Sequence, residues 1–190
     1  MPSKPVTKKN PQSVLDLIPR MQTLPDEDPI LLADLREAFL AELAPATAYE
    51  ISLAEQLVGL EWEGQRLRRL RDDLLLQEYS YQSVGVFEYG KITREPVLGK
   101  SDQTKRLSKA LISSDPELRR EAELALVAHE VTPTQILAKA WQQRVDELER
   151  FETQLTQLET RRRRLRADYD QLVALRRRRV QEISDAEVVE

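Results

Sequence analysis

Residues 137–183 read LAKAWQQRVDELERFETQLTQLETRRRRLRADYDQLVALRRRRVQEI, and this heptad repeat decides the fold of the chain. When Trp141 is placed at heptad position a, apolar residues recur at positions a and d. Ten of the fourteen seam positions are apolar: Leu137, Trp141, Leu148, Phe151, Leu155, Leu158, Leu165, Tyr169, Leu172 and Ile183. Because Glu, Gln and Arg fill the outer faces, the pattern predicts a coiled coil.

The coiled-coil stretch is predicted to be one uninterrupted helix. The sequence TPTQ at residues 132–135 has the form of a helix N-terminus, with a capping threonine, a proline at the first helical position and a glutamine that completes a capping box. No Gly or Pro occurs in residues 134–190. We therefore expect a helix over residues 132–185, roughly 75–80 Å long at ~1.5 Å per residue, and a short tail over residues 186–190.

Four seam positions carry arginine instead of an apolar residue: Arg144, Arg162, Arg176 and Arg179. In a parallel, in-register homodimer Arg162 would face its own copy, which costs Coulomb energy and desolvation. An antiparallel partner helix with acidic residues opposite the arginines would relieve this cost. Within the chain, candidate acidic residues lie upstream on a second predicted helix: Glu50, Glu55, Glu61 and Glu63.

An antiparallel helical hairpin is predicted over residues 29–78. Asp28 can cap the first helix, a proline occupies its first position, and Pro45 ends it. The sequence TAYE at residues 47–50 has the capping-box form and starts the second helix. We expect this helix to run to about residue 77, which corresponds to roughly 45 Å.

The residues before the hairpin, 1–28, are predicted to form a flexible basic arm. Within the arm, an apolar pattern indicates a short helix over residues 13–21, which Pro19 weakens. The apolar residues of that pattern are Val14, Leu15, Leu17, Ile18 and Met21.

Residues 79–101 break the helical pattern, because they hold three glycines, a proline and four aromatic residues. We predict a loop here, with a short β-hairpin over residues 84–92 as an alternative. The aromatic side chains favour a lid packed on the helices, with a protein-binding tip as the second interpretation. Two short helices are expected over residues 102–131, behind Ser101 and from the sequence SDPE at residues 114–117. The chain is therefore predicted to be all-α.

The predicted helix lengths indicate whether the chain can cover its apolar seam without a partner. The second helix is expected to be about 30 Å shorter than the last one, so it cannot cover the whole apolar seam. Soluble monomers rarely keep a large apolar stripe exposed. We therefore expect the chain to bind itself or another helical protein through its C-terminal coiled coil, with a monomeric antiparallel bundle as the alternative.

Sequence motifs for catalysis are absent. The chain has no cysteine, a single histidine at position 129, no glycine-rich phosphate loop and no nucleophile elbow. We expect a non-enzymatic interaction or scaffold protein with no cofactor, no metal and no evident small-molecule substrate. The N-terminus lacks the apolar stretch of a secretory signal, and no apolar run is long enough to span a membrane. A cytoplasmic location is expected.

Two arginine clusters suggest a second function. Between residues 161 and 179 there are nine arginines against two aspartates, a local charge of +7. The arginines are Arg161, Arg162, Arg163, Arg164, Arg166, Arg176, Arg177, Arg178 and Arg179. Guanidinium groups bind phosphate oxygens well, so the clusters predict possible contacts with nucleic acid. The alternative is pairing with acidic residues of neighbouring helices, and no known nucleic-acid-binding motif accompanies the clusters.

The hairpin region carries a further pattern, which consists of EDP at residues 27–29, ELAP at 42–45, Thr47 with Glu50, Trp62, and Arg68 with Arg69. This pattern resembles a module of helical bacterial proteins that carry no assigned activity, some of them near mobile elements. The resemblance covers about a quarter of the chain. It implies a phage or mobile-element setting for the nucleic-acid-binding alternative, and it transfers no functional residue.

Overall fold

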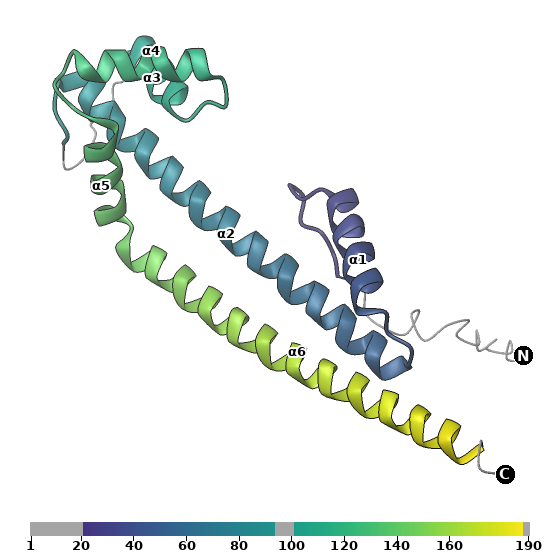
Figure 1. Ribbon diagram of the computed structural model, residues 1–190. Helices are drawn as coiled ribbons and strands as arrows, with labels where there is room; N and C mark the ends of the chain where they lie inside the picture. Colours follow the sequence, from purple (N-terminus) through teal and green to yellow (C-terminus); the bar gives the residue numbers. More distant parts are fainter. Residues whose placement is uncertain (1–20, 94–100, 188–190) are drawn as a thin grey trace, which may run out of the picture. The chain divides into compact units, whose positions relative to one another are not determined.

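The computed structural model describes residues 21–93 and 101–187, with side chains described as far as residue 183. Helices account for the regular structure in these ranges, and no strand occurs among the described residues (Figure 1). The all-α prediction is therefore confirmed. The helices are α1 (Pro29–Leu43), α2 (Ala48–Tyr89), α3 (Asp102–Leu111), α4 (Pro116–Val127), α5 (Pro133–Gln143) and α6 (Val145–Glu187). The short helix predicted over residues 13–21 lies almost entirely outside the described residues.

Three helices begin directly after the capping residues that the sequence indicated. The Asp28 carboxylate accepts a hydrogen bond from the backbone N–H of Ile30, at 2.8 Å, at the start of α1. At the start of α5, Thr132 and Gln135 form a complete capping box. Each of these contacts satisfies a backbone donor that has no partner within the helix. The same chemistry starts α3, where the Ser101 hydroxyl accepts from the third residue of the helix.

The chain divides into two compact units. Unit 1 comprises residues 1–64 and 157–190, and unit 2 comprises residues 65–156. Helices α2 and α6 therefore contribute residues to both units. Each unit is described by itself below.

In unit 1, α1 packs antiparallel against the first part of α2. Leu32 near the start of α1 clusters with Val58 and Trp62, whereas Leu43 at its end clusters with Leu53 and neighbouring residues of α2. The second cluster also includes residues of α6, with Tyr169 at its centre and Leu165, Leu172 and Val173 around it. This part of unit 1 is therefore a three-helix arrangement in which α1 and α2 pack against α6.

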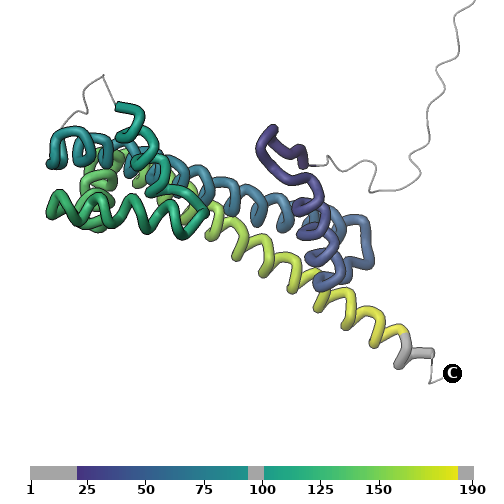
Figure 2. Tube along the Cα trace, turned by 90° about the horizontal axis from the view of Figure 1, so that it is seen from above, coloured from purple at the N-terminus to yellow at the C-terminus, as the bar shows by residue number. Residues whose placement is uncertain are grey.

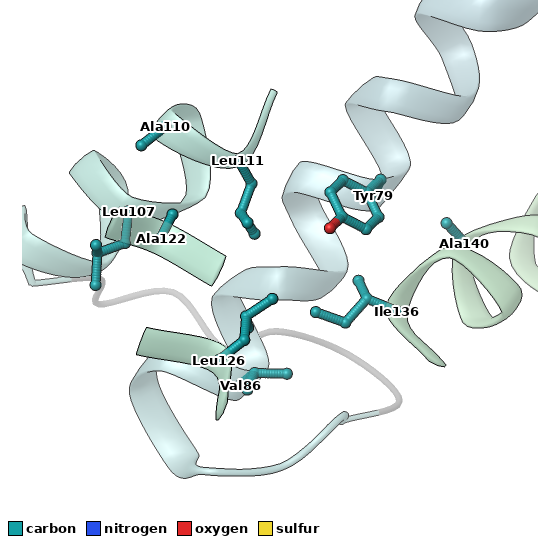
Figure 3. Packing of buried hydrophobic residues seen from close by; sticks show 9 residues of the cluster. All are labelled: Tyr79, Val86, Leu107, Ala110, Leu111, Ala122, Leu126, Ile136 and Ala140. Atoms are coloured by element: carbon teal, nitrogen blue, oxygen red, sulfur yellow. The ribbon is translucent and has the colours of Figure 1, made fainter. Parts of the chain in front are cut away.

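In unit 2, the last turns of α2 form the centre of an apolar core. Helices α3, α4 and α5 contribute to the same core, and Figure 2 shows α3 and α4 beside the end of α2. Figure 3 shows the nine buried residues of this cluster. They are Tyr79 and Val86 of α2, Leu107, Ala110 and Leu111 of α3, Ala122 and Leu126 of α4, and Ile136 and Ala140 of α5.

The loop predicted to begin at residue 79 is wrong for its first eleven residues, because α2 continues to Tyr89. The β-hairpin alternative over residues 84–92 is wrong as well. Tyr79 and Val86 are seven residues apart, so they lie on one face of a helix and both enter the unit 2 core. Packing of that face outweighs the low helix propensity of Gly85. The helix ends where Gly90 adopts a positive φ of 69°.

The helix predicted over residues 132–185 is interrupted once. Helix α5 ends at Gln143 and α6 begins at Val145, because Arg144 leaves helical geometry with φ −117° and ψ 17°. No glycine or proline causes this break. The side chain of Arg144 instead bonds to Glu78 of α2, and this contact accompanies the change of backbone direction.

The prediction that the second helix of the hairpin would be about 30 Å shorter than the C-terminal helix is also wrong. Helix α2 has 42 residues and α6 has 43. Each is roughly 65 Å long at ~1.5 Å per residue. The argument that α2 is too short to match the C-terminal helix therefore fails, and a need for a partner has to be judged from exposed side chains.

Candidate interaction surfaces

Two of the seam arginines pair with α2 inside unit 1. Arg176 Nε lies 2.7 Å from a carboxylate oxygen of Glu50, and Arg162 Nη1 lies 2.5 Å from one of Glu61. The arginine that comes later in α6 pairs with the glutamate that comes earlier in α2, so the two helices run antiparallel in unit 1. Glu50 and Glu61 thus act as the predicted acidic partners, whereas Glu55 bonds instead to Arg36 of α1.

Glu50 is completely buried, and hydrogen bonds to its carboxylate compensate its charge. Burial raises the pKa of its carboxyl, but hydrogen bonds from the Ala46 backbone N–H and from Arg176 outweigh this effect. The net result is a pKa below the ordinary value. The backbone N–H of Glu50 in turn donates to the Thr47 hydroxyl at 3.2 Å. The carboxylate that starts α2 therefore also fixes the position of α6 in unit 1.

A third seam arginine pairs with α2 inside unit 2. Arg144 Nε lies 2.8 Å from a carboxylate oxygen of Glu78, whose side chain is almost completely buried. The Gln82 side-chain amide donates to the other oxygen of Glu78 at 2.6 Å. Glu147 also contacts Arg144, and the hydrogen bonds that the guanidinium donates to Glu78 and Glu147 raise its pKa. Arg144 is therefore a structural residue at the junction of α5 and α6.

The predicted apolar seam is used unevenly. Leu148 and Tyr169 are buried, and the Tyr169 hydroxyl donates to the Leu43 carbonyl at 2.8 Å. Five further seam residues are half-buried: Phe151, Leu155, Leu158, Leu165 and Leu172. The remaining three are exposed: Leu137 (43%), Trp141 (46%) and Ile183 (61%). Most of the seam therefore packs within its own chain.

The exposed part of the seam on α5 forms a short apolar stripe. Leu137 and Trp141 are one turn apart on the same face, and Val145 follows after the break with 39% of its surface exposed. The adjacent face of α5 carries Ile136 and Ala140, which are fully buried in the unit 2 core. The stripe therefore sits on a helix that its own core holds in place. Trp62, the other tryptophan of the chain, is by contrast fully buried.

The arginine clusters are only partly occupied by internal ion pairs. Besides Arg162 and Arg176, two members pair with carboxylates: Arg163 with Glu159, and Arg166 with both Glu42 and Asp170. Five arginines form no ion pair within the described part of the chain: Arg161, Arg164, Arg177, Arg178 and Arg179. All five are exposed. Pairing with carboxylates of the chain is therefore confirmed for four of the nine arginines, and nucleic-acid contact stays a prediction for the other five.

The residues of the EDP and ELAP pattern have structural positions in unit 1. The Trp62 indole N–H donates to the Glu27 carboxylate at 3.1 Å, and Asp28 caps α1. Ala44, within ELAP, adopts a left-handed conformation that ends α1. The pattern therefore specifies how the hairpin begins and turns. Sequence reasoning missed a groove between α1 and α2, because no motif marks it.

Comparison with models of protein families, with curated proteins and with solved structures finds no match to this chain. The resemblance to a bacterial module thus stays a prediction. Among the described residues, no group of three or more His, Asp or Glu side chains is placed to hold a metal ion. No helix in the described ranges is long and apolar enough to cross a membrane.

Proposed function

We propose that this chain is a non-enzymatic helical interaction protein, which binds a second copy of itself or another helical protein. The contact surface is the exposed part of the coiled-coil seam on α5, formed by Leu137 and Trp141, together with Val145 at the start of α6. The observation that carries the proposal is the half-exposed Trp141 on a helix whose adjacent face is fixed in the unit 2 core.

Trp141 has the properties of an interface anchor. Tryptophan is among the residues that contribute most to binding when a partner buries them, because the indole ring removes a large apolar area from water. Spacing of i, i+4 between Leu137 and Trp141 suits insertion into the groove of another helix. Since the seam residues from Leu148 onward are mostly covered within the chain, α5 is the part of the seam available to a partner.

Self-association tests the proposal directly. Light scattering at tens of micromolar is expected to give a mass above that of a monomer. The double variant Leu137→Ser/Trp141→Ser should shift the equilibrium toward the monomer by roughly 30-fold or more, since a central tryptophan is typically worth about 2 kcal/mol. The matched control is Leu118→Ser, because Leu118 on α4 is as exposed, at 44%, as Leu137. A strictly monomeric wild type, or equal effects of both variants, would contradict self-association through α5.

A second candidate function is nucleic-acid binding, and it is favoured by the five exposed arginines without an ion pair in the described region. Arg161, Arg164 and Arg179 lie on nearly one side of α6, since 18 residues correspond to five full turns of an α-helix. Their guanidinium groups are free to bind phosphate oxygens, with release of counterions.

The arginine test avoids the residues that hold the fold. A variant in which Arg161, Arg164, Arg177, Arg178 and Arg179 are replaced by Gln keeps the ion pairs of Arg162 and Arg176. If the candidate function holds, this variant should abolish a salt-sensitive gel shift. Replacement of Arg119 and Arg120 on α4 serves as the control. A wild type that shifts no nucleic acid at low salt would exclude this function.

A further inference from the structure

A groove runs along unit 1 between α1 and α2, with a volume of about 1440 Å³. Its walls are one face of each helix. On α1 the lining residues recur every three or four positions, and they are Pro29, Leu32, Ala33, Arg36, Glu37, Leu40 and Ala41. On α2 they extend from Ser52 to Glu63. The lined lengths are about 18 Å on α1 and about 16 Å on α2, at ~1.5 Å per residue.

The floor of the groove is apolar and open. Leu32 and Val58 belong to one buried cluster beneath it, and Gly59 leaves room above them. A Cβ atom added at Gly59 would meet a single side chain, with the Met21 sulfur at 4.0 Å. Glu37 and Glu63 stand exposed at the rim, and the Arg36–Glu55 ion pair joins the two helices. The groove therefore suits a short amphipathic segment that carries a basic residue.

The chain itself supplies such a segment directly beside the groove. Met21 is the first described residue, and it already lines the groove and packs against the Leu32–Val58–Trp62 cluster. The eight residues before it, SVLDLIPR at 13–20, contain Val14, Leu15, Leu17 and Ile18. The spacing of Val14, Leu17 and Ile18 is i, i+3 and i+4, which would place them on one face of a helix that ends before Pro19.

We propose that this groove between α1 and α2 is the docking site of residues 13–20 of the same chain. A helix over residues 13–18 would span about 9 Å, which fits within the lined length. The segment carries one acidic and one basic residue, Asp16 and Arg20, and the groove is lined by charges of both signs, including Glu63 and Arg161. Covalent attachment at Met21 gives the segment a high effective concentration, which favours it over a free partner.

Paired acidic substitutions in the full chain test this docking. Leu17→Asp/Ile18→Asp places two charges on the apolar face, and Asn10→Asp/Gln12→Asp adds the same charge outside the docked segment. The first variant should expose the groove, so the amides of α1 exchange with solvent at least tenfold faster than in wild type, with unchanged helical content by circular dichroism. The control variant should leave α1 exchange unchanged. Equal exchange in both variants would overturn the proposal.

A labelled peptide of residues 10–20 provides the reciprocal measurement. Fluorescence anisotropy should detect binding of the peptide to the Leu17→Asp/Ile18→Asp chain, and at least tenfold weaker binding to wild type, whose groove is already filled. Adding Gly59→Phe should abolish binding, because the ring fills the space above Gly59. Equally tight binding to wild type, or none to any variant, would refute intrachain docking. Protection of α1 that depends on protein concentration would refute it too, since the segment would then come from a second copy.

Discussion

Units 1 and 2 each contain a buried glutamate of α2 that pairs with an arginine of the predicted coiled-coil seam. In unit 1 Glu50 pairs with Arg176, and in unit 2 Glu78 pairs with Arg144. The two pairs differ in their surroundings. Glu50 also accepts from a backbone N–H, and its arginine lies within a continuous helix. Glu78 has the Gln82 amide as its second partner, and its arginine interrupts the helix.

This difference shows that the same charged contact can have different effects on the backbone. At Arg176 the guanidinium reaches its partner from regular helical geometry. At Arg144 the backbone leaves the helix, and α5 is thereby directed into the apolar core of unit 2 through Ile136 and Ala140. Unit 1 relies on two small apolar clusters and several ion pairs, whereas unit 2 has one larger apolar cluster.

The largest loss of folding stability is expected from removal of Arg176 in unit 1. Arg176→Met leaves the Glu50 carboxylate fully buried without its cation, and breaking a buried pair in this way typically costs about 3–5 kcal/mol. Arg144→Met should cost less, because the Glu78 side chain keeps slight exposure to solvent (6%), whereas that of Glu50 has none. Urea denaturation of both variants measures the difference. Arg178→Met is the control on the same helix and should change stability by less than ~0.5 kcal/mol. Equal losses at positions 176 and 178 would show that the Glu50 pair is unimportant.

A smaller loss is expected from a methyl group added in unit 2. In Gly85→Ala the new Cβ would lie 2.6 Å from the Thr93 hydroxyl oxygen and 3.3 Å from its backbone nitrogen. Overpacking of this kind usually costs about 1–3 kcal/mol. Thermal unfolding should show the loss, and Thr93→Ala should recover part of it in the double variant, since it removes the nearer of the two clashes. A Gly85→Ala protein as stable as wild type would mean that the segment after α2 does not pack on Gly85.

The pH dependence of stability should distinguish the buried Glu50 from an exposed glutamate of the same helix. The pKa of Glu50 is lowered in the folded chain from its ordinary value of 4.5. The ionised carboxylate therefore contributes stability above pH 4.5, and this contribution is lost as the pH falls through the folded pKa. Denaturation measured from pH 7 to pH 3 should show a shallower acid loss in Glu50→Gln than in wild type. Glu63→Gln, which alters an exposed carboxylate, should retain the wild-type slope. If stability fell with pH in the same way in all three proteins, Glu50 would not be the source of the acid loss.

Local chemistry predicted much of the fold. The capping residues of α1, α3 and α5 are short-range signals, since each bonds within three residues. The pairing of Arg162 and Arg176 with glutamates of α2 was also foreseeable, because a charge on an apolar seam requires a partner opposite it.

The features that were missed depend on distant residues. The break at Arg144 involves Glu78, 66 residues earlier in the sequence, and no local pattern marks it. The extension of α2 through Gly85 depends on a core supplied by α3, α4 and α5. Glycine and aromatic residues lowered the apparent helix propensity there, and tertiary packing reversed that preference.

The smallest change in folding stability, and the only increase, is expected from a substitution at Gly59 of α2, in unit 1. Unlike Gly85, Gly59 has room for a side chain, because an added Cβ would make only ordinary contact with Met21 at 4.0 Å. Gly59→Ala should therefore raise the free energy of unfolding by up to about 1 kcal/mol through helix propensity. Chemical denaturation of Gly59→Ala beside Gly85→Ala tests this, since the same substitution in one helix should have opposite signs. A loss at position 59 would show that α1, α2 and Met21 pack more tightly than the open groove indicates.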